Sequence, residues 1–197
     1  MSAKLSILII EDEKNICDFI AAALMNQDYR VFKSYSGMDG LSQITSRCPD
    51  ILLLDLGLPD MDGTDIIREV RKWSAMPVIV ISARTLENEK VLALDLGADD
   101  YITKPFGTSE LLARIRTAVR HLTRINATNS TSHIFRASGL VIDFDRRRIT
   151  VHEQEVHLTQ VEYKIVSMLA NNSGKVITYD ALISHVWGPY ADDNNRI

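Results

Sequence analysis

The chain has 197 residues, of which 46% are hydrophobic and 24% are charged, and its formal net charge is −4. This composition excludes a chain that is disordered throughout, and the length suits one large domain or two small ones. No run approaches the roughly 20 apolar residues of a membrane span and no secretion signal precedes the first apolar run, so we expect a cytoplasmic protein with reduced cysteines.

The first part of the sequence alternates short apolar runs with amphipathic stretches. Five runs are typical of buried strands: 5–10, 30–35, 51–55, 77–82 and 101–103. Apolar residues at helical spacing predict helices at 14–26, 64–73, 86–97 and 108–122. This alternation predicts an α/β fold with a doubly wound, five-stranded parallel sheet, which we place at residues 1–123.

The character of the sequence changes at residues 124–133, where a polar stretch rich in Ser, Thr and Asn predicts a linker. Residues 139–159 then alternate apolar and polar side chains at a period of two, as antiparallel strands do. Two further helices are predicted at 160–172 and 179–188. We therefore expect a separate, small α+β domain at residues 134–197.

Polar side chains lie at the carboxyl ends of four predicted strands. They are Glu11 and Asp12 after the first strand, Asp55 at the end of the third, Ser82 at the end of the fourth and Lys104 after the fifth. In an open parallel sheet these ends line one crevice. Three neighbouring carboxylates repel one another, which favours a bound divalent cation, and hard oxygen ligands favour Mg²⁺ or Mn²⁺ over zinc. Together with Lys104, this arrangement suits a phosphoryl group, with Asp55 as the expected nucleophile.

Four motifs give the sequence a specific resemblance: "IIEDE", "LLLDLGLPDMDG", "VISAR" and "GADDYITKPF". In their order and spacing, the chain resembles the bacterial two-component response regulators of the OmpR/PhoB family over essentially its whole length. The stretches "RKWSAMPVIVISAR" and "HVWGP" also resemble the Kdp-type, potassium-responsive members. The resemblance implies a transcription factor that accepts a phosphoryl group on Asp55 from a sensor histidine kinase. It implies no enzymatic activity beyond the protein's own phosphotransfer and dephosphorylation.

The resemblance assigns metal-binding roles to the acidic end of the crevice. Asp12 and Asp55 would bind the cation directly, Glu11 would bind it through water, and the backbone carbonyl of Gly57 would be a further ligand. As an alternative that does not exclude metal binding, Glu11 and Asp12 could be acids that favour the dipole of the following helix. The acids at positions 60 and 62 are interpreted as loop residues that add negative charge.

The resemblance also assigns roles on the phosphoryl side of the crevice. Ser82 would hydrogen-bond the phosphoryl group, and Tyr101 would swing inward behind it. Lys104, held by a cis peptide bond to Pro105, would pair with the phosphoryl group. Ser82 could instead be a simple turn residue, and Tyr101 could belong to the core.

Phosphorylation is expected to produce a homodimer through the face formed by the fourth helix, the fifth strand and the fifth helix. The ion pairs expected between subunits are Lys90 with Glu110, Asp100 with Arg114 and Asp99 with Arg120. These side chains could also be ordinary surface charges, each of which contributes little. A two-fold dimer would place two output domains on a repeated DNA site.

The second domain resembles the winged-helix output module of the same family, with its leading sheet and first two helices. The recognition helix and the wing should follow, but only residues 189–197 remain there. We therefore expect a partial domain that lacks most of the DNA-reading helix and the wing, with Asn195 and Arg196 as candidate DNA contacts. Acidic residues slightly outnumber basic ones after residue 125, whereas a DNA-binding module should have a basic face.

Two other functions stay open. A truncated receiver could act by sequestering its kinase or another partner without binding DNA. An Mg²⁺-dependent aspartyl phosphatase is the second alternative, but those enzymes usually place a second acid two residues after the nucleophile. That position is Gly57 here, which argues against a phosphatase.

Overall fold

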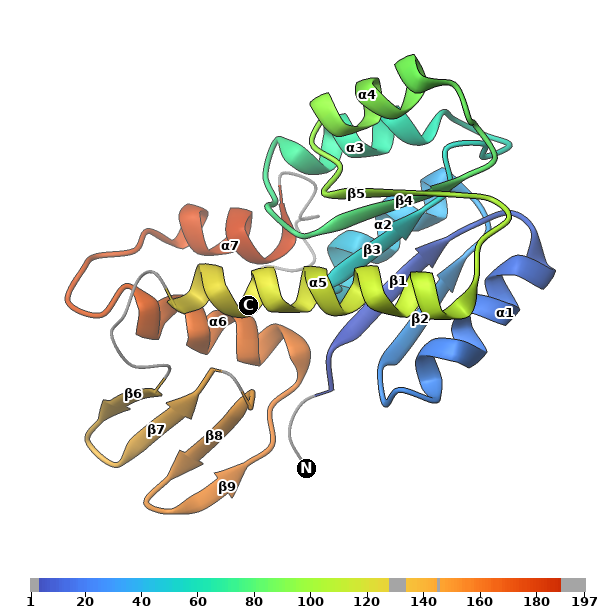
Figure 1. The fold of residues 1–197 in the computed structure, drawn as a ribbon. Helices are drawn as coiled ribbons and strands as arrows, with labels where there is room; N and C mark the ends of the chain where they lie inside the picture. The colour runs from blue at the N-terminus through green and yellow to red at the C-terminus, as the bar shows by residue number, and fades with distance from the viewer. Residues whose placement is uncertain (1–3, 128–133, 145, 189–197) are drawn as a thin grey trace. The chain divides into compact units, whose positions relative to one another are not determined.

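The structure, a computed structural model, describes residues 4–127, 134–144 and 146–188 (Figure 1). The chain divides into two compact units, of which the first is Leu5–Ala118 and the second begins at Val119. Within the described part of the chain, no helix is both long enough and apolar enough to cross a membrane.

The first unit contains a five-stranded parallel sheet with the strand order β2-β1-β3-β4-β5. Its strands are β1 (Ser6–Ile10), β2 (Arg30–Ser34), β3 (Ile51–Leu54), β4 (Val78–Ser82) and β5 (Asp100–Thr103). Every residue of β1, β3 and β4 is buried, as expected for central strands that are covered on both faces. The predicted doubly wound α/β fold is thus confirmed.

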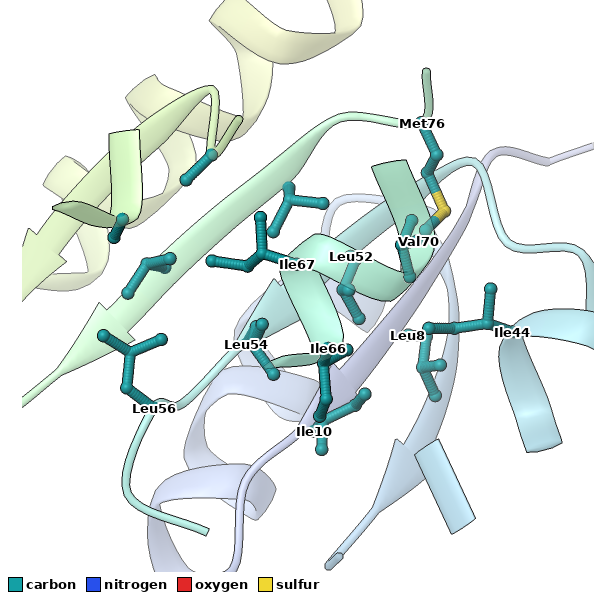
Figure 2. Close-up of a cluster of buried hydrophobic side chains, with 14 residues drawn as sticks. Leu8, Ile10, Ile44, Leu52, Leu54, Leu56, Ile66, Ile67, Val70 and Met76 are labelled. Carbon is teal, nitrogen blue, oxygen red and sulfur yellow. The ribbon is translucent and has the colours of Figure 1, made fainter. Parts of the chain in front are cut away.

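Helices cover both faces of this sheet (Figure 1). They are α1 (Lys14–Met25), α2 (Gly37–Arg47), α3 (Gly63–Arg71), α4 (Glu87–Asp95) and α5 (Thr108–Ala127). One core cluster joins alternate residues of the strands, such as Leu8 and Leu52, to Ile44 of α2 and Ile66 of α3 (Figure 2). This alternation follows from the two-residue period of a strand, and it fixes the register of the sheet.

Two helices differ from the sequence-based expectation. Helix α2 has no predicted bounds, because Gly37 and Gly40 interrupt its pattern of apolar residues. A side chain at Gly40 would clash with the Ile10 side chain, so this glycine allows α2 to approach β1 closely. Helix α5 continues to Ala127 and includes the first residues of the predicted linker, since residues 123–127 contain no Pro or Gly that would end a helix.

Beyond the end of α5, the described residues of the second unit form a four-stranded antiparallel sheet and two helices. The sheet has the order β6 (Ile134–Ala137), β7 (Leu140–Asp143), β8 (Arg148–Val151) and β9 (Gln154–Val156), followed by α6 (Gln160–Asn171) and α7 (Tyr179–Trp187). A small core of Ile142, Phe144, Ile149 and Tyr163 joins the sheet to α6. The predicted recognition-helix fragment, with Asn195 and Arg196, lies outside the described residues.

Candidate functional site

Three carboxylates meet at the carboxyl end of the parallel sheet. Strands β1 and β3 are neighbours with Ile10 opposite Leu54, so the residues that follow them lie side by side. As a result, Glu11, Asp12 and Asp55 each place a carboxylate oxygen within 4.8 Å of the others. Glu11 and Asp55 are buried, whereas Asp12 is more exposed. The structure therefore brings together the carboxylates that the sequence predicts to meet at this edge of the sheet.

Lys104 brings a positive charge to these carboxylates from the loop after β5. Its Nζ lies 2.6 Å from Oδ2 of Asp55 and 2.9 Å from Oε1 of Glu11. The exposed Glu13 is more distant, at 3.6 Å. The backbone N–H of Lys104 donates to the carbonyl oxygen of Ser82 at 2.9 Å, and the peptide bond to Pro105 is cis. One buried ammonium group thus bridges the ends of β1 and β3.

The positive charge of Lys104 only partly balances the carboxylates of this cluster. Burial raises the pKa of Glu11 to about 7; the hydrogen bond from Lys104 opposes this rise, and the charge of Asp55 adds to it. Burial lowers the pKa of Lys104, but hydrogen bonds to Asp55 and Glu11 outweigh this effect and leave the pKa above its ordinary value. A single ammonium group faces several acids, so the site keeps excess negative charge.

These residues fit a divalent cation. Oε2 of Glu11 is buried and makes no hydrogen bond, although it lies 2.8 Å from Nζ of Lys104. A carboxylate oxygen keeps lone pairs for a cation beside one such ion pair, and two further carboxylates lie next to it. Mg²⁺ and Mn²⁺ prefer such hard oxygen ligands.

Ser82 and Tyr101 lie close together on β4 and β5. Ser82 is buried, and its Oγ accepts a hydrogen bond from the backbone N–H of Arg84 at 3.2 Å. The hydroxyl of Tyr101 donates to the carbonyl oxygen of Arg84 at 2.9 Å. Burial raises the pKa of Tyr101. Both side chains therefore hold the turn that follows β4, while their predicted roles toward a phosphoryl group stay predictions.

Two acids of the loop after β3 have specific partners that the sequence did not indicate. Asp60 accepts hydrogen bonds from the backbone N–H groups of Gly37 (2.8 Å) and Met38 (2.9 Å), at the start of α2. These bonds lower the pKa of Asp60. Asp62 is the N-cap of α3 and accepts from the N–H of Thr64 at 2.9 Å. The only signal in the sequence is that Asp62 precedes a helix, where Asp is a favoured cap.

Gly63, the first residue of α3, supports the backbone beneath Asp55. A methyl group at Gly63 would lie 2.5 Å from the carbonyl oxygen of Asp55 and 2.7 Å from Cα of Leu56. We expect Gly63→Ala to lower the free energy of unfolding of the first unit by about 2 kcal/mol, because backbone atoms cannot rotate away. Urea titration measures the change, with Gly57→Ala as the control, since a methyl group there would lie 3.8 Å from Oδ1 of Asp55, an ordinary contact. Equal stabilities of the two variants would contradict this prediction.

Four of the residues predicted to pair between subunits make contacts within one chain. Arg114 of α5 lies 2.9 Å from Oδ1 of Asp100 and 3.2 Å from Oε1 of Glu110. Nζ of Lys90 lies 5.9 Å from the ring centre of Tyr101. A dimer that uses the predicted pairs would have to exchange these contacts for contacts between subunits.

The remaining predicted pair joins Asp99 to Arg120. Oδ2 of Asp99 accepts hydrogen bonds from Arg71 of α3 and from the backbone N–H of Val78, each at 2.8 Å. Arg71 also donates to the carbonyl oxygen of Gly97 at 2.8 Å. Asp99 therefore ties α3 to the first residues of β4 and β5, and Arg120 lies exposed on α5. All three intersubunit pairs stay predictions.

Comparison with known proteins identifies the family. The model of the "Response regulator receiver domain" matches residues 7–116, and that of "Transcriptional regulatory protein, C terminal" matches residues 153–197. The chain belongs to the response regulators. This response regulator consists of a receiver and a DNA-binding domain of the OmpR/PhoB type, and it is homologous to transcription regulators of two-component systems. The predicted family, fold class and general function are thereby confirmed.

Individual relatives agree with this assignment. The response regulator is 46% identical to the KDP operon transcriptional regulatory protein KdpE of Escherichia coli over 191 residues. This match spans 97% of this chain and 84% of the relative. It is 39% identical to the response regulator ArlR of Staphylococcus aureus over 182 residues. This match spans 92% of this chain and 80% of ArlR. Among solved structures, DrrB of Thermotoga maritima, an OmpR/PhoB homolog, has a TM-score of 0.57 at 27% identity and covers 94% of this chain and 81% of that chain.

Proposed function

We propose that this response regulator accepts a phosphoryl group on Asp55 from a sensor histidine kinase in the cytoplasm. The observation that supports this most directly is the position of Lys104, whose Nζ lies 2.6 Å from Oδ2 of Asp55 beside the buried Glu11. The proposal is supported by the closeness of the Asp55 carboxylate, the ammonium group of Lys104 and two further carboxylates. Asp12, Asp55, the carbonyl of Gly57 and, through water, Glu11 would hold Mg²⁺ or Mn²⁺.

In the proposed reaction, a carboxylate oxygen of Asp55 bonds to phosphorus as the bond between phosphorus and the histidine nitrogen of the kinase breaks. The cation would neutralise negative charge on the phosphoryl oxygens. Lys104 would pair with one of these oxygens, and the hydroxyl of Ser82 would donate to another, since a hydroxyl oxygen that accepts from the N–H of Arg84 can also donate. The protein thus acts as a phosphoacceptor rather than as an enzyme that turns over a substrate.

The output would follow from the added charge, which is about −1.5 to −2 at neutral pH. Ser82 and Tyr101 hold the turn between β4 and α4, so a change at the phosphoryl group can reach the face formed by α4, β5 and α5. We propose that the phosphorylated protein dimerises through this face and regulates transcription by binding promoter DNA through its C-terminal domain.

Phosphate transfer tests the central step. The full chain is incubated with Mg²⁺ and acetyl phosphate, and its intact mass is measured. We expect one phosphoryl adduct on the wild type and none on Asp55→Asn, which keeps the shape of the side chain but removes the nucleophile. Asp65→Asn, an exposed acid on α3, is the matched control and should be labelled like the wild type. An adduct on Asp55→Asn, or none on the wild type, would falsify the proposal.

A further inference from the structure

Arg84 connects the loop after β4 to the loop after β3. It lies two residues beyond Ser82, and its Nη2 donates to the carbonyl oxygen of Leu56 (3.2 Å) and to Oδ2 of Asp62 (2.7 Å). Asp62 is itself fixed, because its other carboxylate oxygen caps α3 by accepting from the N–H of Thr64. The guanidinium group is therefore held by a charge-assisted bond while it contacts the backbone carbonyl.

The peptide group between Leu56 and Gly57 is bonded at both of its polar ends. Its carbonyl oxygen accepts from Arg84 and, at 3.1 Å, from the N–H of Gly63. Its N–H, which belongs to Gly57, donates to Oδ1 of Asp55 at 3.1 Å. The direction of this N–H therefore depends on the bonds made by the carbonyl on the other side of the same rigid plane.

The two oxygens of the Asp55 carboxylate thus have different partners. Oδ1 accepts from the backbone N–H of Gly57, and Oδ2 accepts from Nζ of Lys104 at 2.6 Å. Two donors on opposite oxygens fix the rotation of the carboxylate plane. A cation at the carbonyl end of the Leu56–Gly57 peptide also polarises the N–H at its other end, because hydrogen bonds in a chain strengthen one another.

We propose that Arg84 is a positioning residue for Asp55, which acts through the Leu56–Gly57 peptide group and is itself oriented by Asp62. This inference rests on the proposed phosphorylation of Asp55. Arg84 bonds to the peptide group rather than to the carboxylate, so its contribution is to the alignment of the nucleophile. Without Arg84, the carbonyl of Leu56 keeps its bond from Gly63, and the Gly57 N–H loses part of its constraint and its polarisation.

The test uses the full chain in two states. In the absence of phosphodonor, the amide proton of Gly57 is observed by nuclear magnetic resonance in the ¹⁵N-labelled wild type and in Arg84→Gln. We expect its resonance to move upfield in the variant, because the bond to Asp55 is weakened. With Mg²⁺ and acetyl phosphate, we expect Arg84→Gln to form the Asp55-dependent adduct about tenfold more slowly than the wild type.

Two further variants separate positioning from a general loss of structure. Arg84→Lys should recover most of both effects, because the two bonds come from the single nitrogen Nη2 and an ammonium nitrogen carries three donors. Asp62→Asn keeps an oxygen that can cap α3 but removes the charge that orients Arg84, so it should shift both readouts in the same direction as Arg84→Gln. If Arg84→Gln does not fold, Asp62→Asn decides the question.

The matched control is Arg68→Gln, which removes an exposed guanidinium group that lies 2.7 Å from Asp65 on α3. It should leave the Gly57 resonance and the rate of adduct formation unchanged. A Gly57 resonance in Arg84→Gln that coincides with that of the wild type overturns the inference, and so does adduct formation at the wild-type rate. Absence of an adduct on the wild type would instead refute the phosphorylation of Asp55, and the Gly57 resonance would still decide whether Arg84 positions the peptide.

Discussion

Lys104→Met is expected to destabilise the first unit by about 3 kcal/mol at pH 8 in the absence of divalent cations. The side chain of Lys104 is 10% exposed and lies between the carboxylates of Glu11 and Asp55, which are almost fully buried. Removal of the ammonium group leaves two buried carboxylates without their cation, and the resulting loss of stability exceeds what the bridge itself contributes. Addition of Mg²⁺ should recover part of the loss, because a cation that binds only the folded state stabilises it.

Urea titration can measure this effect through the fluorescence of Trp73, which packs against the core of the first unit. A Trp187→Phe background removes the other tryptophan, which lies in α7. The control is Lys33→Met, because Lys33 pairs with the exposed Asp18 at 2.7 Å and such surface pairs contribute about 1 kcal/mol or less. If Lys104→Met and Lys33→Met lowered the free energy of unfolding equally, the buried pairing of Lys104 would contribute no more than a surface ion pair, and the prediction would be wrong.

The apparent affinity for Mg²⁺ is expected to rise about tenfold between pH 6 and pH 8, because binding requires ionised carboxylates. Glu11 has its pKa raised from 4.5 to about 7, mainly by burial, so much of this group carries a proton at pH 6. A bound cation must displace that proton. Calorimetric titrations in two buffers with different ionisation enthalpies should therefore detect proton release near pH 7.

The variant Glu11→Gln should remove this pH dependence, whereas Glu13→Gln, which removes an exposed acid nearby, should keep it. Without metal, the native state holds the proton on Glu11 more tightly than the unfolded chain does. The stability from this linkage is therefore fully present below about pH 4.5 and is lost as pH rises through about 7. An Mg²⁺ affinity of the wild type that does not change from pH 6 to pH 8 would exclude Glu11 as the linked group.

The strands could be predicted from the sequence because the apolar pattern that marks each strand lies within the strand itself. Runs such as 51–54 are apolar without interruption, and the rule that parallel strands end at one edge then places Asp55 beside Glu11 and Asp12. Helix α2 was harder to predict, because the reason for Gly40 is its contact with Ile10 on another element. Its boundaries depend on packing that no local pattern describes.

The supporting contacts of the site could not be predicted for a similar reason. That Asp60 caps α2 and that Asp62 holds Arg84 depends on the conformation of the loop after β3. The contact of Arg114 with Asp100 likewise depends on how α5 lies against β5. The candidate site residues could be named from their places at the ends of strands, whereas the contacts that surround them became visible only in three dimensions.

The order of the site residues along the chain has a consequence for biosynthesis. Glu11, Asp12 and Asp55 leave the ribosome well before Lys104, which follows the edge strand β5. Until β5 joins the sheet, a partly synthesised chain has acidic groups at its centre without their ammonium partner. Completion of the first unit at Ala118 still precedes synthesis of most of the second unit, so the nascent receiver can bring these carboxylates and Lys104 together before the C-terminal domain has been made.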